Sequence, residues 1–118
     1  MANTLTLYGI PNCDTVKKAR RWLDAEGIDY TFHDYKKSGV DATKLTAWIK
    51  THGIDTIVNK RGTTWRKLPQ ETRDNMDETL ALAVMEDQPA IIKRPVLEHN
   101  RGTLIGFSTD QYQQLLQN

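Results

Sequence analysis

The first 35 residues constrain the fold most strongly, because they follow the pattern of a strand, a helix and a second strand. Residues 4–8 alternate polar and apolar side chains, which is typical of a strand. A helix is predicted from Cys13 or the next residue to a stop at Gly27. Apolar side chains recur on it at helical spacing, at Val16, Ala19 and Leu23. Aromatic-rich residues 28–35 predict a second strand. Cys13 therefore lies at the turn between strand and helix.

The middle of the chain has helical patterns and the end returns to strands. Asp41 is predicted to cap a helix that Gly53 ends, residues 59–67 form a polar loop, and residues 77–87 form another helix. Residues 90–97 and 104–107 are apolar and flank a turn signal at 100–102, which predicts a hairpin. A serine followed three residues later by glutamine, Ser108 and Gln111, fits a capping box for a final helix.

This order of elements predicts an α/β protein with a thioredoxin-like fold, a mixed sheet in the order βαβ…ββα and an inserted helical subdomain. We expect a single domain over residues 1–118, with the core formed by 1–35 and 89–118 and the insertion by 36–88. Pro95 interrupts an apolar run, and proline removes a hydrogen-bond donor from a sheet. Pro95 therefore either begins the strand proper or follows a cis peptide bond.

Composition excludes several classes of protein. The chain has 118 residues, 16 basic against 15 acidic side chains and 38% hydrophobic residues, as in a globular domain without the basic face of a nucleic-acid binder. We expect no membrane segment, no export signal and a monomer. The single cysteine forms no internal disulfide and no thiolate metal site, and the three scattered histidines predict no bound metal. We also expect no bound cofactor. A lone thiol without an export signal indicates the reducing cytoplasm.

Cys13 is the main candidate for chemistry. A sulfur at the first turn of a helix faces unpaired backbone N–H groups and the positive end of the helix dipole, which favour the thiolate and bind anions. The alternative is an inert, small apolar side chain. Position 16 is valine, so there is no Cys-x-x-Cys pair. A single thiol that attacks a disulfide needs a second thiol from outside, from glutathione or a glutaredoxin- or thioredoxin-type protein.

Three basic residues are candidates to assist that thiolate. Arg94, directly before Pro95, has the fork of donors that fits a carboxylate or oxyanion, although it also fits a surface strand. Arg61 lies in the polar loop, where most charges are merely solvated, and Lys17 follows Cys13 by one helical turn. We predict Cys13 and Arg94 as catalytic residues. Arg61, Lys17 and Asn12, the residue just before the cysteine, are predicted to bind the anion.

Three motifs, in this order along the chain, closely resemble the arsenate reductase (ArsC)-like family and, within it, the Spx/YffB branch. They are Tyr-Gly-Ile-Pro-Asn-Cys-Asp-Thr-Val-Lys-Lys-Ala-Arg from residue 8, Asn-Lys-Arg-Gly-Thr-Thr-Trp-Arg from residue 59 and Ile-Lys-Arg-Pro-Val from residue 92. The resemblance implies a thioredoxin-like fold with a helical insertion, a nucleophilic Cys13 and a cis Pro95 packed near it. It also implies that Arg61 and Arg94 hold an oxyanion, as their counterparts do in arsenate reductases.

The departures from that family's pattern rank the possible functions. Arsenate reductases of this type have a further arginine where this chain has Phe107, and a histidine where it has Gly9. The resemblance then favours a monothiol reductase that uses glutathione as co-substrate. Arsenate reduction coupled to glutathione and glutaredoxin is the first alternative. The second is an Spx-like adaptor that binds RNA polymerase, although Spx regulators usually carry the Cys-x-x-Cys switch that Val16 removes.

Overall fold

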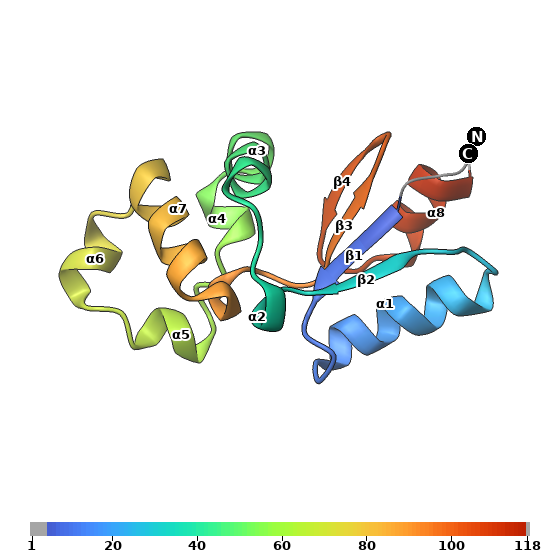
Figure 1. Ribbon diagram of the computed structural model, residues 1–118, viewed down its shortest axis with the longest axis horizontal. Helices are drawn as coiled ribbons and strands as arrows, with labels where there is room; N and C mark the ends of the chain where they lie inside the picture. Colours follow the sequence, from blue (N-terminus) through green and yellow to red (C-terminus); the bar gives the residue numbers. More distant parts are fainter. Residues whose placement is uncertain (1–4, 118) are drawn as a thin grey trace. The chain divides into compact units, whose positions relative to one another are not determined.

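The computed structural model describes residues 5–117, which divide into two compact units (Figure 1). The first unit comprises the chain up to Tyr35 and again from Arg94, and residues 36–93 form the second. The expected boundary after residue 88 lies five residues too early. Residues 89–93 stay with the second unit because the Lys93 N–H donates to the Ile57 carbonyl (2.8 Å) and the Asn59 N–H donates to the Ile91 carbonyl (2.8 Å).

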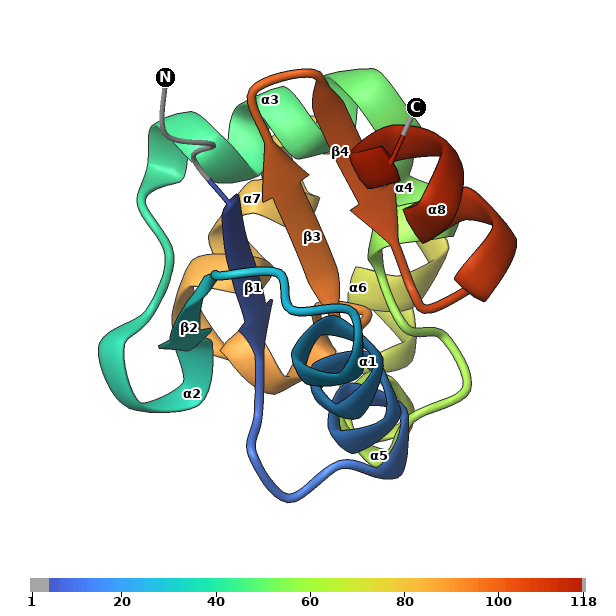
Figure 2. The same ribbon diagram turned by 90° about the vertical axis from the view of Figure 1, so that its right-hand side faces the viewer.

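The first unit is a four-stranded mixed sheet with helices (Figure 2). Its elements are β1 (Leu5–Gly9), α1 (Asp14–Ala25), β2 (Thr31–Asp34), β3 (Val96–His99), β4 (Gly102–Ile105) and α8 (Thr109–Gln117). The strand order is β2-β1-β3-β4, with β1 parallel to β2 and antiparallel to β3, and β3 antiparallel to β4. The predicted α/β, thioredoxin-like fold is confirmed. Thr4, the predicted first residue of the first strand, lies outside the described residues.

One face of this sheet forms the core of the first unit. Leu7 of β1 pairs with Leu97 of β3, and both are fully buried. The predicted apolar stripe of α1 is confirmed, since it is completely buried at Val16, Ala19 and Leu23. Tyr112 of α8 joins the same cluster. Because each of these elements contributes to one apolar cluster, the sheet and both helices hold each other in place.

Three strands differ from the prediction. Of the hairpin strand predicted over residues 90–97, only Val96 and Leu97 belong to β3, because Pro89–Ile91 form a 3₁₀ helix. The predicted strand over residues 28–35 is limited to β2, because its ladder with β1 runs only from Thr31 to Asp34, opposite Gly9. Tyr35 instead begins the short helix α2 (Tyr35–Ser38). The return strand of the hairpin is β4, two residues earlier than predicted. Gly106 follows it with a φ of +85°, a conformation that favours glycine and ends the strand.

The second unit is helical. It contains α3 (Ala42–His52), α4 (Ile54–Ile57), α5 (Thr63–Arg66), α6 (Gln70–Asp74), α7 (Glu78–Asp87) and the 3₁₀ helix η1 (Pro89–Ile91). The predicted cap of α3 is confirmed, because the Asp41 carboxylate accepts from the Thr43 N–H (3.2 Å). Asp77, predicted as the first residue of a helix, is instead the N-cap of α7, and its carboxylate accepts from the Leu80 N–H (2.8 Å). The predicted polar loop is partly wrong, since α5 lies within it, and α6 was not predicted. No helix within residues 5–117 is long and apolar enough to cross a bilayer.

Candidate active site

Cys13 is the N-cap residue of α1. Its backbone is extended (φ −139°, ψ 127°), and its carbonyl accepts the first bond of the helix, from the Lys17 N–H at 2.9 Å. The side chain is half-buried and, within residues 5–117, makes no capping hydrogen bond. The first backbone N–H groups of a helix have no partner inside it. The sulfur therefore lies beside donors and a positive dipole end that favour a negative charge.

The loop that carries Cys13 leaves β1 through a close contact with α1. A Cβ atom on Gly9 would lie 2.8 Å from Cγ2 of Val16, which is closer than real Cβ contacts allow. Val16 is itself fully buried and cannot easily move aside. Glycine at position 9 therefore lets the end of the strand approach the first turn of the helix.

The sheet register brings three segments to the edge where Cys13 lies. Gly9, at the end of β1, pairs with Asp34 at the end of the parallel strand β2. Tyr8 pairs with Val96, the first residue of the antiparallel strand β3. The loop after β1, the residue after β2 and the residues before β3 consequently all leave the sheet at the same edge. These are the Cys13 loop, Tyr35 and the Arg94–Pro95 dipeptide.

Arg94 connects the two other side chains at this edge. Its half-buried guanidinium donates hydrogen bonds to the Tyr35 hydroxyl and to the Cys13 sulfur. Burial of the charge lowers the pKa of Arg94, but its interactions with Tyr35 and then with Cys13 outweigh that cost and leave the pKa above its ordinary value. Arg94 is therefore a permanent positive charge in contact with the sulfur.

Tyr35 is completely buried. Burial raises its pKa to about 12, although the hydrogen bond from Arg94 and that residue's charge act in the opposite direction. Interactions with Cys13 and Asp34 raise the pKa further. At neutral pH the side chain is an uncharged phenol whose oxygen accepts a hydrogen bond from the guanidinium.

The structure brings together some of the predicted site residues. Arg94 contacts Cys13, and the Arg94–Pro95 peptide is cis, with Pro95 buried. Asn12 is exposed in the turn just before Cys13, and Lys17 is exposed on the next turn of α1. Arg61 belongs to the second unit, where it is exposed and its N–H donates to the side-chain oxygen of Asn59 (3.2 Å). The roles of Asn12, Lys17 and Arg61 in binding an anion stay predictions.

Phe107 has an apolar environment. Its ring meets that of Tyr112 edge-on, with 4.9 Å between the centroids, and packs against the core of the first unit. This contact is an ordinary aromatic pair. The position where arsenate reductases carry an additional arginine thus contributes to packing in this protein.

Sequence reasoning missed Tyr35. It was assigned to the second strand as an ordinary aromatic residue, whereas it begins α2 and contacts Arg94. A signal for it was present, because parallel strands joined by a helix end at the same edge of the sheet. The residue that follows the second strand was therefore a neighbour of the Cys13 turn.

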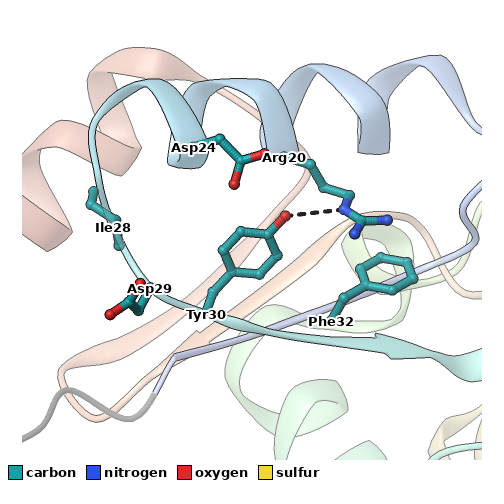
Figure 3. A pocket seen from close by; sticks show the side chains of 6 residues that line it. All are labelled: Arg20, Asp24, Ile28, Asp29, Tyr30 and Phe32. Atoms are coloured by element: carbon teal, nitrogen blue, oxygen red, sulfur yellow. Dashed lines mark hydrogen bonds between the residues drawn. The ribbon is translucent and has the colours of Figure 1, made fainter.

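A groove on the first unit is lined by residues that lie between Cys13 and Tyr35 in the sequence and includes neither of them (Figure 3). Arg20 of α1 spans it: the Nε atom donates to the Tyr30 hydroxyl (3.0 Å), and the guanidinium lies 4.2 Å from the centre of the Phe32 ring. Asp24 and Asp29 line the same groove, which includes none of the predicted site residues. Among residues 5–117, no three metal-binding side chains gather at one place.

Three proteins illustrate what the chain is similar to. A solved structure of a YffB protein shares 49% identity over 96% of this chain and 99% of its own, with a TM-score of 0.92. An arsenate reductase (ArsC) related protein from Brucella melitensis also shares 49% identity, over 98% of this chain and 96% of its own, with a TM-score of 0.74. An uncharacterised protein of Haemophilus influenzae is 45% identical over 92% of this chain and 96% of its own length.

A more distant relative is the global transcriptional regulator Spx of Staphylococcus aureus, which is 25% identical over 95% of this chain and 86% of its own. These likenesses agree with the predicted Spx/YffB branch. The model of the ArsC family matches residues 8–115, which include the end of β1, the Cys13 turn, β2 and the hairpin. The protein described here thus belongs to the ArsC family.

Proposed function

We propose that the protein is a monothiol oxidoreductase of the cytoplasm, in which Cys13 is the nucleophile and glutathione the co-substrate. The observation that carries this proposal is the hydrogen bond from Arg94 to the Cys13 sulfur at the start of α1. A guanidinium and a helix N-terminus both stabilise a thiolate relative to a thiol. The thiolate is the reactive form in exchange with disulfides.

The reaction consists of two disulfide exchanges. The Cys13 thiolate attacks the glutathione sulfur of a mixed disulfide on a substrate, forming a bond between Cys13 and glutathione while the substrate sulfur leaves as a thiolate and takes a proton from water. A second glutathione thiolate then attacks the glutathione sulfur bound to Cys13. Oxidised glutathione is released and the Cys13 thiolate is restored. Overall, the substrate thiol is released from its mixed disulfide and one free glutathione is consumed. Its sulfur leaves as oxidised glutathione together with the glutathione that was bound to the substrate.

The charges near the sulfur suit a glutathione partner. Glutathione carries two carboxylates, and arginine binds carboxylates through paired donors. Arg94 lies at the sulfur, and Lys17 and Asn12 are exposed on either side of it along the chain. We propose that these residues bind the carboxylates of the bound glutathione. A glutaredoxin- or thioredoxin-type protein in place of the second glutathione is the alternative reductant.

The first test is covalent capture by oxidised glutathione. We expect mass spectrometry of the treated protein at neutral pH to show one glutathione adduct, located at Cys13 and released by excess reduced glutathione. Cys13→Ser must show none. A turnover assay with a glutathionylated peptide then measures reduction. Absence of both the adduct and turnover from the parent protein would overturn the proposed function.

Arsenate reduction is a second candidate, because the Brucella melitensis relative is described as arsenate reductase related. The apolar contacts of Phe107 argue against it, since the site then lacks one cationic ligand at that position. A coupled assay with arsenate, glutathione and glutaredoxin distinguishes the two. We expect turnover on the glutathionylated peptide and none on arsenate, whereas rapid arsenate turnover would favour the second candidate.

An adaptor function is the third candidate, favoured by the likeness to Spx. It predicts that the protein binds purified RNA polymerase and that Cys13→Ser binds it equally well. The oxidoreductase proposal predicts no such binding. Binding that survives loss of the thiol, together with absence of disulfide exchange, would therefore replace the proposal.

A further inference from the structure

Tyr35 is a buried polar residue at the same sheet edge, and the proposed reaction does not use it. It follows the last residue of β2, is completely buried and begins α2. Its ring fills space that an apolar residue of the same shape would fill equally well. The presence of a buried hydroxyl group therefore needs an explanation, because burying a polar group is unfavourable unless it is hydrogen-bonded.

The hydroxyl has a partner, the Arg94 guanidinium. Arginine has donors and no acceptor, so the phenol oxygen must accept this bond. The same guanidinium donates to the Cys13 sulfur. One flat, rigid group is thus held by two acceptors that come from different segments of the chain, one from the end of β2 and the other from the start of α1.

Holding the guanidinium in place matters because the arginine side chain is long and flexible. It has about 2 kcal/mol of rotamer entropy to lose when it is fixed in one position. Arg94 is only half-buried, so a guanidinium bound to the sulfur alone would be free to turn toward water. A second acceptor on buried, immobile Tyr35 reduces that freedom.

We propose that Tyr35 is a positioning residue, whose hydroxyl holds the Arg94 guanidinium against the Cys13 sulfur. The inference rests on the proposed function, because there the guanidinium stabilises the attacking thiolate. Tyr35 does not act as an acid or a base in the exchange. Its raised pKa, about 12, keeps the phenol protonated at neutral pH.

The test measures the rate of Cys13 alkylation by iodoacetamide as a function of pH. Tyr35→Phe removes the hydroxyl and keeps the ring. We expect the midpoint of the profile to move to higher pH and the rate at neutral pH to fall by roughly fivefold, the effect of one ordinary hydrogen bond. An unchanged profile would overturn the proposal.

Tyr112→Phe is the matched control. Tyr112 is another completely buried tyrosine of the same unit, and its hydroxyl donates to the Gly106 carbonyl (3.1 Å) instead. A similar loss of stability is expected from this variant, without any shift of the alkylation profile. A shift as large as that of Tyr35→Phe would show that the profile responds to general loosening, and would contradict a specific role for Tyr35.

A double mutant separates action through Arg94 from direct action on the sulfur. In the Arg94→Ala background, Tyr35→Phe should change the profile no further, because residues that act through one another are not additive. An equal effect in both backgrounds would overturn the proposal. If Tyr35→Phe does not fold, Arg94→Lys replaces it. Lysine keeps the charge and lacks the rigid fork, so we expect the midpoint to rise, and an unchanged midpoint would contradict the proposal.

The alkylation experiment does not depend on the proposed substrate. Iodoacetamide reports the thiolate and needs no disulfide or glutathione. If neither a glutathione adduct nor turnover appears but Tyr35→Phe shifts the alkylation profile, the proposed function fails while the positioning role stands. If the adduct forms and Tyr35→Phe leaves the profile unchanged, the positioning role fails alone.

Discussion

The guanidinium of Arg94 hydrogen-bonds to the sulfur of Cys13, although the two residues lie near opposite ends of the sequence. The sheet creates this contact, because the antiparallel pairing of Tyr8 with Val96 brings the end of β1 beside the start of β3. Neither residue would form a site alone. Together they place a permanent positive charge at the start of a helix, where a sulfur is already favoured as a thiolate.

The contact between Gly9 and Val16 predicts that the first turn of α1 does not tolerate a side chain at position 9. The Cβ of Gly9→Ala would lie 2.8 Å from Val16 Cγ2. We expect the free energy of unfolding to fall by about 1–3 kcal/mol, as for overpacking in a filled core. Urea denaturation measures it.

Val16→Ala tests the cause of that loss. It removes the two methyl groups that obstruct a Cβ at position 9, so the double mutant Gly9→Ala/Val16→Ala should lose less stability than the sum of the single changes. Strict additivity would show that Gly9→Ala acts by another route, such as backbone freedom.

The contacts of Arg20 predict that replacing it destabilises the protein more than replacing its neighbour Arg21. Arg20 stacks on the Phe32 ring and donates to the Tyr30 hydroxyl, whereas Arg21 is exposed on the outer face of α1. Arg20→Ala should cost about 1–2 kcal/mol of unfolding free energy, from one cation–π contact and one hydrogen bond. Arg21→Ala should stay within about 0.5 kcal/mol. Equal losses in thermal or urea unfolding would contradict this account of the groove.

His99 predicts that the protein loses stability in weak acid. The side chain is only 6% exposed, its Nδ1 accepts from the Arg101 N–H (3.1 Å), and its Nε2 has no partner within the described part of the chain. Burial, and then the charge of Arg101, lower the pKa of His99. The unfolded chain, with a histidine pKa of about 6.5, therefore binds the proton more readily than the folded one.

The lower pKa of His99 in the folded protein sets the direction in which stability changes with pH. The stability that neutral His99 contributes is complete above about pH 6.5 and is lost as the pH falls from there toward the lower folded pKa. Burial lowers the pKa of His52 as well, so both histidines act in the same direction. Urea unfolding between about pH 7.5 and 5.5 should show this decline, with a shallower slope in His99→Gln. An equal slope in both proteins would contradict the prediction.

Local patterns in the sequence predicted the elements that depend on local physics. The buried stripe of α1 and the aspartate cap of α3 follow from helical spacing and from the need to pair the first N–H groups. Helix α6 was missed because its five residues, Gln70–Asp74, are all polar and show no apolar period. The boundary between the units at residue 93 was missed because backbone hydrogen bonds to Ile57 and Asn59 determine it. The sequence of residues 89–93 alone does not reveal these distant partners.

In the candidate site, too, the residues with a local sequence signal were predicted and the residue that depends on strand pairing was not. Cys13 was predicted because a turn followed by a helix is a local signal, and Arg94 because it precedes a proline in an apolar run. Tyr35 was missed because its importance depends on where β2 ends, and the register with β1 decides that. A pairing that stops at Gly9 and Asp34 cannot be derived from residues 28–35 alone.

The most direct test of the central claim is the pH profile of Cys13 alkylation in the parent protein and in Arg94→Ala. Lys93→Ala is the matched control, since it removes the adjacent exposed positive charge. We predict that Arg94→Ala moves the midpoint to higher pH, because the thiolate loses a hydrogen bond from a charged group, and that Lys93→Ala leaves it nearly unchanged. The same midpoint in all three proteins would contradict a thiolate held by Arg94.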